Sequence, residues 1–76
     1  MSAKPILIVG RTAMEALEHA RAHRLGDNWR FVTHAHELFG TSPATHDLVF
    51  TGDWRDREDV DAIRDRAKGQ GFKVPG

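Results

Sequence analysis

Apolar residues occur along this chain in short blocks that are separated by longer, more polar segments. Residues 6–9 are apolar without interruption, which is typical of a strand buried on both faces. Residues 29–33 and 47–51 are two further blocks with the composition of strands. Residues 72–74 form a shorter block, and we expect them to be a fourth strand at an edge of the sheet.

Two of the intervening segments have the spacing of helices. A first helix is predicted from residue 13 to about residue 24, because Thr12 and Glu15 have the spacing of a capping box. A second helix is predicted over about residues 56–70, where apolar residues recur at intervals of three and four. The apolar residues of this second stripe are Val60, Ile63 and Ala67.

The resulting order of elements predicts a single α/β domain over residues 1–76. Each connection between strands is long enough for a right-handed crossover, and residues 34–40 could hold one or two helical turns. We therefore predict a small Rossmann-like open sheet of about four mainly parallel strands in the order 2-1-3-4, flanked by two main helices. The alternative is a ferredoxin-like α+β fold, in which strands two and four run antiparallel to strands one and three.

Composition narrows the classes of function. The 76 residues include no cysteine, which excludes disulfides and thiolate metal sites and fits a cytoplasmic protein. The 11 basic and 11 acidic residues balance, so general binding to nucleic acid is disfavoured. A local patch made by Arg21, Arg24 and Arg30 is the remaining nucleic-acid possibility. The longest apolar run, residues 6–9, is too short to span a bilayer.

A parallel sheet would bring three polar segments together at the carboxyl ends of its strands, where α/β domains bind ligands. Free amides at a helix start can bind an anion, and Asp53 could bind Mg²⁺ or a ribose hydroxyl. The candidate ligand-binding residues are Gly10, Arg11, Thr12, His34, His36, Gly52, Asp53 and Arg55.

The motifs at these positions are incomplete. A dinucleotide fingerprint needs three spaced glycines, and of these only Gly10 is present. A capping box would also use the same amides as an anion, so we favour a plain turn from strand to helix over a phosphate site. His19 and His23, one turn beyond Glu15, could bind zinc from one helix face, but a third placed ligand is missing and a solvated face is favoured. Asp53 or Asp56 could equally cap the next helix.

Two tryptophans are a large share of the aromatic residues of so small a chain. Trp29 and Trp54 can be core anchors, or they can form a hot spot for a protein partner together with Arg30 or Arg55. The candidate partner-binding residues are Trp29, Arg30 and Trp54. No serine lies in a nucleophile-elbow context, so no catalytic residue, cofactor or metal is predicted.

Several blocks of the sequence resemble small uncharacterised proteins of actinobacterial phages. They are the G-R-T block at 10–12, the W-R-F-V block at 29–32 and the V-F-T-G-D-W block at 49–54. The resemblance covers roughly residues 6–72 and implies a phage accessory protein that acts in a bacterial cytoplasm. It implies no activity, cofactor or catalytic residue.

The leading hypothesis is a non-enzymatic accessory protein that binds a host or phage protein. Such a protein could also form a homodimer, because an edge strand can pair with a second copy. The alternative is a minimal nucleotide- or phosphate-binding domain that uses the carboxyl ends of the strands.

Overall fold

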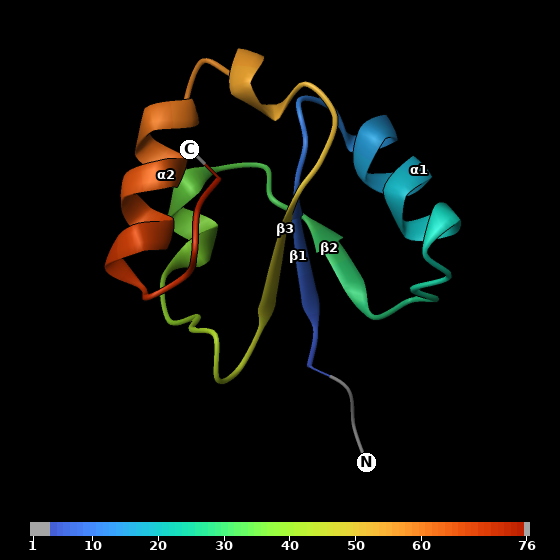
Figure 1. Ribbon diagram of the computed structural model, residues 1–76, viewed down its shortest axis with the longest axis horizontal. Helices are drawn as coiled ribbons and strands as arrows, with labels where there is room; N and C mark the ends of the chain where they lie inside the picture. Colours follow the sequence, from blue (N-terminus) through green and yellow to red (C-terminus); the bar gives the residue numbers. More distant parts are fainter. Residues whose placement is uncertain (1–3, 76) are drawn as a thin grey trace.

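The computed structural model describes residues 4–75 and shows a parallel sheet of three strands. The strands are β1 (Ile6–Val9), β2 (Trp29–Phe31) and β3 (Asp47–Phe50), and their order is β2-β1-β3 (Figure 1). The central strand β1 pairs in parallel with both neighbours, so Ile6 lies beside Trp29 on one side and beside Asp47 on the other. The predicted parallel arrangement is confirmed, and the ferredoxin-like alternative is wrong.

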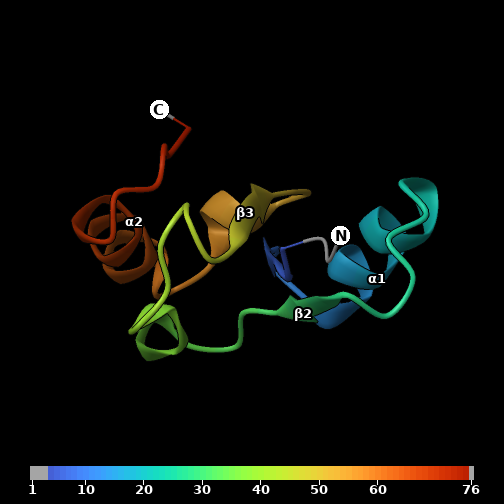
Figure 2. The same cartoon turned by 90° about the horizontal axis from the view of Figure 1, so that it is seen from below.

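Helices cover both faces of this sheet. Helix α1 (Ala13–Ala22) lies on one face, and α2 (Val60–Gly69) lies on the other together with the 3₁₀ helix η1 (Ala35–Leu38) (Figure 2). A second 3₁₀ helix, η2 (Trp54–Asp56), connects β3 to α2. Among residues 4–75, no helix is long and apolar enough to cross a bilayer.

The uninterrupted apolar run of β1 is explained by the two layers that cover it. Ile8 faces α1 and is buried with Ala16 and Ala20. Leu7 and Val9 face the other way, into a larger cluster that includes side chains of α2 and η1. These three of the four β1 residues are at most 2% exposed, so the strand is buried on both faces as the pattern predicts.

The predicted fourth strand does not form. Phe72 is buried and Val74 packs against the core, but the backbone of residues 72–75 has no strand pairing. The amide of Phe72 donates instead to the carbonyl of Ala67, and Gly71 adopts a positive φ of 93°, so the chain reverses at the end of α2. Pro75 follows and has no amide to give. The apolar block therefore joins the core through its side chains alone.

The boundaries of the predicted helices also differ. The first helix ends at Ala22, because Arg24 takes a left-handed conformation with φ of 54°. The second begins at Val60 rather than near residue 56, because Arg57 is extended after η2. This extended residue separates two helical segments that the sequence pattern merges into one.

Candidate functional site

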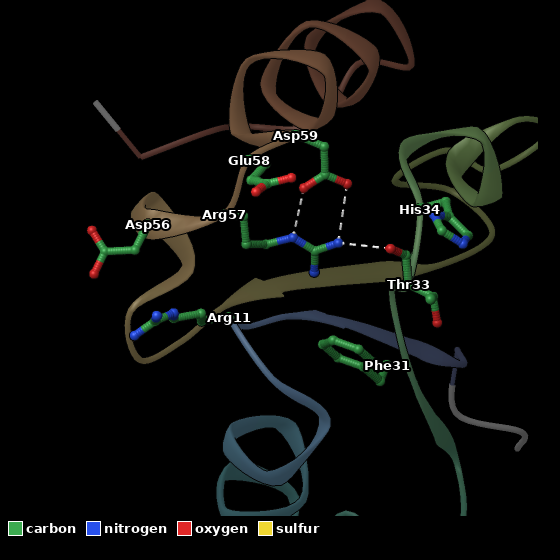
Figure 3. Close-up of a pocket in the computed structure, with 8 residues that line it drawn as sticks. All are labelled: Arg11, Phe31, Thr33, His34, Asp56, Arg57, Glu58 and Asp59. Carbon is green, nitrogen blue, oxygen red and sulfur yellow. Dashed lines mark hydrogen bonds and ion pairs between the residues drawn. The ribbon is translucent and has the colours of Figure 1, made fainter.

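The carboxyl ends of the three parallel strands lie at one edge of the molecule, which we call the rim. It consists of residues 10–12 after β1, residues 32–34 after β2 and residues 51–59 after β3. The predicted segments around Gly10, His34 and Gly52 therefore lie at a common edge, as the parallel topology requires. Figure 3 shows the side chains that line the hollow at this edge.

Arg57 is the central polar side chain of the rim. Its side chain is only 7% exposed, and its guanidinium donates to the carbonyls of Gly10 at 2.9 Å, Val32 at 2.7 Å and Thr33 at 2.8 Å. It also forms a two-point ion pair with Asp59, at 2.9 and 3.1 Å (Figure 3). One planar group thus joins the ends of β1 and β2 to the residue that precedes α2.

The ion pair with Arg57 changes the electrostatics of Asp59. Hydrogen bonds from the guanidinium hold the pKa of the Asp59 carboxyl below its usual value. Asp59 is thereby kept ionised, and Arg57 retains its counterion beside three carbonyl oxygens. Because the guanidinium donors are used in this way, Arg57 is a structural link rather than a ready phosphate ligand.

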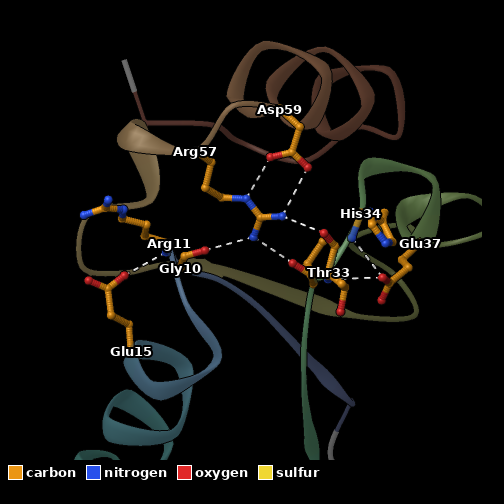
Figure 4. Close-up of polar contacts among 9 residues, drawn as sticks. Gly10, Arg11, Glu15, Thr33, His34, Glu37, Arg57 and Asp59 are labelled. Carbon is orange, nitrogen blue, oxygen red and sulfur yellow. Dashed lines mark hydrogen bonds and ion pairs between the residues drawn. The ribbon is translucent and has the colours of Figure 1, made fainter.

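Glu15 makes a similar link between β1 and β3, with the opposite charge. Its carboxylate accepts from the amide of Arg11 at 2.7 Å and from the amide of Asp53 at 3.1 and 3.2 Å (Figure 4 shows the first of these contacts). Amide donation by Asp53, followed by that of Arg11, lowers the pKa of Glu15. The carboxylate packs so closely on Gly52 that a Cβ there would lie 2.5 Å from Glu15 Cδ.

The capping box predicted at the start of α1 is present only in part. The Thr12 hydroxyl accepts from the amide of Glu15 at 3.3 Å, as predicted. The Glu15 carboxylate, however, accepts chiefly from the amide of Arg11 and from that of Asp53 in the loop after β3, and the amide of Thr12 contributes less. The turn from β1 to α1 therefore also contacts the loop after β3 through the Glu15 carboxylate.

The amides after β2 are satisfied by a third carboxylate. Glu37 of η1 accepts from the amides of Thr33 at 3.1 Å and His34 at 2.9 Å (Figure 4). Its other oxygen lies 3.9 Å from Nε of Arg30. Backbone donors at the ends of β1, β2 and β3 are thus bonded to side chains of the chain itself.

The hollow of the rim is an open pocket of about 570 Å³ with walls of both charges. Its lining residues are Arg11, Phe31, Thr33, His34, Asp56, Arg57, Glu58 and Asp59. The Arg57 guanidinium lies 5.5 Å from the centre of the Phe31 ring, on which it can stack. The pocket therefore combines an aromatic side chain, three cationic or titratable basic groups and three carboxylates.

The remaining predicted ligand residues have varied positions. His36 is outside the pocket lining, and its ring stacks on that of His34 at 5.3 Å. Asp53 contributes its amide to Glu15, and no side-chain capping bond is made by Asp53 to η2. The guanidinium of Arg55 lies 4.6 Å from the centre of the Trp54 ring.

The two tryptophans have different environments. Trp54 is 3% exposed and packs beside Phe50, so it is part of the core and presents almost no surface to a partner. Trp29 is half-buried against the α1 layer, and the neighbouring Arg30 is exposed on β2. Both of these lie away from the rim pocket.

The histidine pair of α1 does not belong to a larger metal-binding group. The rings of His19 and His23 stack at 4.2 Å, and partial burial, followed by the charge of His23, lowers the pKa of His19. Within residues 4–75, no group of three or more His, Cys, Asp or Glu side chains is placed to hold a metal.

Two residues that bond to the backbone of the rim are missing from the sequence-based candidates: Arg57, which lies in the rim, and Glu37 of η1, which lies beside it. Arg57 stands between Asp56 and Glu58 in an acidic stretch, which resembles an ordinary solvated surface. The only local signal is its position just before a helix start, where a carboxylate such as Asp59 is common and an arginine can pair with it.

No protein-family model, curated protein sequence or solved structure matches this chain.

Proposed function

We propose that this chain is a non-enzymatic accessory protein that binds another protein through the rim, in the phage setting that the sequence resemblance implies. The observation that supports it best is that backbone amides and carbonyls at the strand ends are already hydrogen-bonded to side chains of this chain. Glu15 and Glu37 accept from the backbone amides, and Arg57 donates to carbonyls and to Asp59. These bonds hold the rim in one shape before a partner binds. A preorganised surface loses little conformational entropy on binding, which favours the binding of another protein to it.

The charges that line the pocket support a protein partner over a phosphate. Arg11 and His34 offer positive or titratable groups, while Asp56 and Glu58 are exposed carboxylates in the same lining. A phosphate group would be repelled by these carboxylates, whereas a protein segment that carries both charges can pair with both kinds. Phe31 adds an aromatic contact of the type that is enriched in protein interfaces.

The phosphate-binding alternative requires a rearrangement. In sheets with this strand order, ligands bind where the crossovers diverge, between β1 and β3. Here the Glu15 carboxylate occupies the amides of Arg11 and Asp53 at that point. A nucleotide bound in the Rossmann-like manner would have to displace Glu15, so we rank this alternative second.

The test compares two variants with the same change of charge. Arg11→Glu alters the rim, and Arg21→Glu alters an exposed residue of α1 that does not line the rim pocket. Wild-type protein and both variants are immobilised and exposed to lysate of an actinobacterial host, with and without phage infection. We expect a protein that wild type and Arg21→Glu retain and that Arg11→Glu loses. With the purified partner, Arg11→Glu should weaken binding at least about tenfold.

Two results would overturn the proposal. The first is the absence of any protein whose retention depends on Arg11. The second is a rise in melting temperature with ATP, NAD or inorganic phosphate that Arg11→Glu abolishes, which would establish the ligand-binding alternative. Binding of DNA or RNA that weakens with salt and depends on Arg21, Arg24 or Arg30 would instead establish a nucleic-acid function.

A further inference from the structure

A second hollow lies away from the rim, where α2 packs beside η1. We call it the η1–α2 groove; it encloses about 370 Å³ and is lined by Ala35, Ala62, Asp65, Arg66 and Gly69. Ala35 belongs to η1, and the other four belong to α2. Because this groove shares no lining residue with the rim pocket, it is independent of the function proposed above.

The four α2 residues form one face of the helix. Their spacing of three, one and three residues places them on the same side, one turn after another. The core-facing side of α2 is made by Ile63 and Ala67, which are fully buried. Ala62, Asp65 and Gly69 are exposed, so this second face is open to a partner.

An aromatic side chain next to this face is left in solvent. Phe39, which follows η1, is 60% exposed, one of two large apolar side chains with such exposure in residues 4–75. The guanidinium of Arg66 lies 3.7 Å from the centre of the Phe39 ring and covers part of it. An exposed phenylalanine stacked with an arginine is a typical anchor of a protein interface.

The order of residues on this face is self-complementary. If two α2 helices cross antiparallel about a two-fold axis between Asp65 and Arg66, Asp65 of each copy faces Arg66 of the other. The same axis places Ala62 opposite Gly69 of the second copy, so the backbones can approach closely at both ends of the contact. A two-fold interface requires this reciprocal match, in which each residue and its counterpart exchange roles.

We propose that the η1–α2 groove is the contact surface of a homodimer, in which two α2 helices pack antiparallel with reciprocal Asp65–Arg66 ion pairs. The second copy is favoured as the occupant because its own α2 supplies the matching charges and the matching small residues. Arg66 lies beside the two-fold axis, and Phe39, on which its guanidinium stacks, lies next to the contact in each copy. Since α2 has only 10 residues, the interface is short and the dimer is expected to be weak and dependent on concentration.

The charge pair allows a test in which two defective variants complement each other. Asp65→Arg gives a chain with two neighbouring positive charges at the axis, and Arg66→Asp gives a chain with two negative charges. Each variant alone should remain monomeric, because like charges meet across the axis. An equimolar mixture should form a one-to-one heterodimer, because both pairs are then attractive. Analytical ultracentrifugation from about 10 µM to about 1 mM measures each case.

Further variants separate dimerisation from folding. Asp27→Arg makes the same charge change as Asp65→Arg at an exposed site after α1, and should dimerise like wild type. If loss of the Phe39 contact unfolds Arg66→Asp, as circular dichroism would reveal, Ala62→Glu replaces it. This change fills the groove without touching the core, and should weaken self-association at least about tenfold.

The expected result is a wild-type mass that rises with concentration, loss of this rise in the single variants and its return in the mixture. A wild type that is monomeric at every concentration would overturn the proposal. So would an Asp65→Arg or Ala62→Glu variant that dimerises like wild type, or a mixture of folded Asp65→Arg and Arg66→Asp that stays monomeric. None of these results depends on whether the rim binds another protein.

Discussion

The rim contains two junctions between neighbouring strand ends, and the chain closes them with opposite charges. Between β1 and β3, the carboxylate of Glu15 gathers the amides of Arg11 and Asp53. Between β1 and β2, the guanidinium of Arg57 gathers the carbonyls of Gly10, Val32 and Thr33. One junction presents donors and is filled by an acceptor, and the other presents acceptors and is filled by a donor.

The contrast follows from the backbone at each junction. The amides that meet Glu15 come from the first turn before α1 and from the turn at Gly52, where φ is 60°. Such turns point amides outward, as anion-binding loops do. At the other junction, the strand ends present carbonyls, which need a donor when they are buried. Side chains of the protein itself therefore fill both junctions: Glu15 fills the one beside Gly52, and Arg57 bonds to Gly10 at the other.

The hydrogen bonds of Arg57 to Gly10 and Val32 are partly buried, whereas those of Glu15 to Arg11 and Asp53 are exposed, so we expect the β1/β2 junction to contribute more to stability. Arg57→Met keeps an apolar stem of similar length but removes every donor to three carbonyls and to Asp59. We expect the free energy of unfolding to fall by about 3 kcal/mol, because the carbonyls and the carboxylate lose a partner whose side chain is 7% exposed. Urea denaturation measures the change.

Arg57→Lys sharpens this prediction, because an ammonium can replace one or two of the contacts but not the planar set. The stability of Arg57→Lys should therefore lie between that of Arg57→Met and that of wild type. Arg21→Met removes an exposed arginine from α1 and should change the stability by less than about 0.5 kcal/mol. Arg57→Met with wild-type stability would show that the guanidinium is not needed to close the β1/β2 junction.

The β1/β3 junction is probed by adding a methyl group where the Glu15 carboxylate lies. Gly52→Ala places a Cβ 2.5 Å from Glu15 Cδ at a residue with φ of 60°. Gly40→Ala is the matched control, with φ of 75° and no atom within 4 Å of the added carbon. Backbone strain alone should lower the free energy of unfolding of the control by about 1 kcal/mol. Gly52→Ala should lower it by about twice as much, because the added carbon also clashes with Glu15.

A double variant locates the source of the extra loss. In a Glu15→Ala background, Gly52→Ala should destabilise the protein no more than Gly40→Ala does, because the carboxylate is gone. Equal effects of the two glycine changes in the wild-type background would contradict the close packing of Glu15 on Gly52. Thermal or urea unfolding of wild type, the three single variants and the double variant measures these differences.

Acid should weaken both junctions. Amide hydrogen bonds, first from Asp53 and then from Arg11, lower the pKa of Glu15 below 4.5, and the Arg57 hydrogen bond lowers the pKa of Asp59 below 3.8. A depressed carboxyl pKa adds stability that is present above the ordinary value and is lost as pH falls through the folded-state value. The free energy of unfolding, measured as a function of pH, should therefore decrease in this acidic range.

Protonation of His19 should cause a separate loss of stability that begins at a higher pH. Its pKa is lowered below 6.5, chiefly by burial, so protonation favours the unfolded chain as pH falls from there. His19→Gln should remove this upper part of the pH dependence, and Glu15→Gln should flatten the lower part. A stability that rises on acidification in either range would contradict these signs.

Much of the fold could be predicted from local pattern. The apolar run of β1 indicated burial on both faces, and the long crossovers indicated parallel strands; both are confirmed. The absence of the fourth strand could not be predicted, because an apolar block indicates that side chains are buried and does not indicate how the backbone is hydrogen-bonded. Phe72 is buried as expected, yet its amide closes the end of α2.

The candidate site was predictable in position but not in detail. Parallel topology alone brings Gly10, His34 and Gly52 to one rim. Arg57 was missed because its carbonyl partners are 24 or more residues away, and no local spacing encodes such contacts. Glu15 was identified as a cap, but its bond to Asp53 spans 38 residues. Phage origin, cytoplasmic location and partner remain predictions.

The smallest expected effect separates the cap of α1 from the junction beside it. Thr12→Ala removes a hydroxyl that accepts from Glu15 at 3.3 Å, near the long limit of such bonds, so we expect a loss of about 0.5 kcal/mol. Thr12→Ser keeps the hydroxyl and should restore most of it. Unfolding in urea measures both. A loss from Thr12→Ala as large as that from Gly52→Ala would mean that the cap, and not the Glu15 carboxylate, determines the β1–α1 turn.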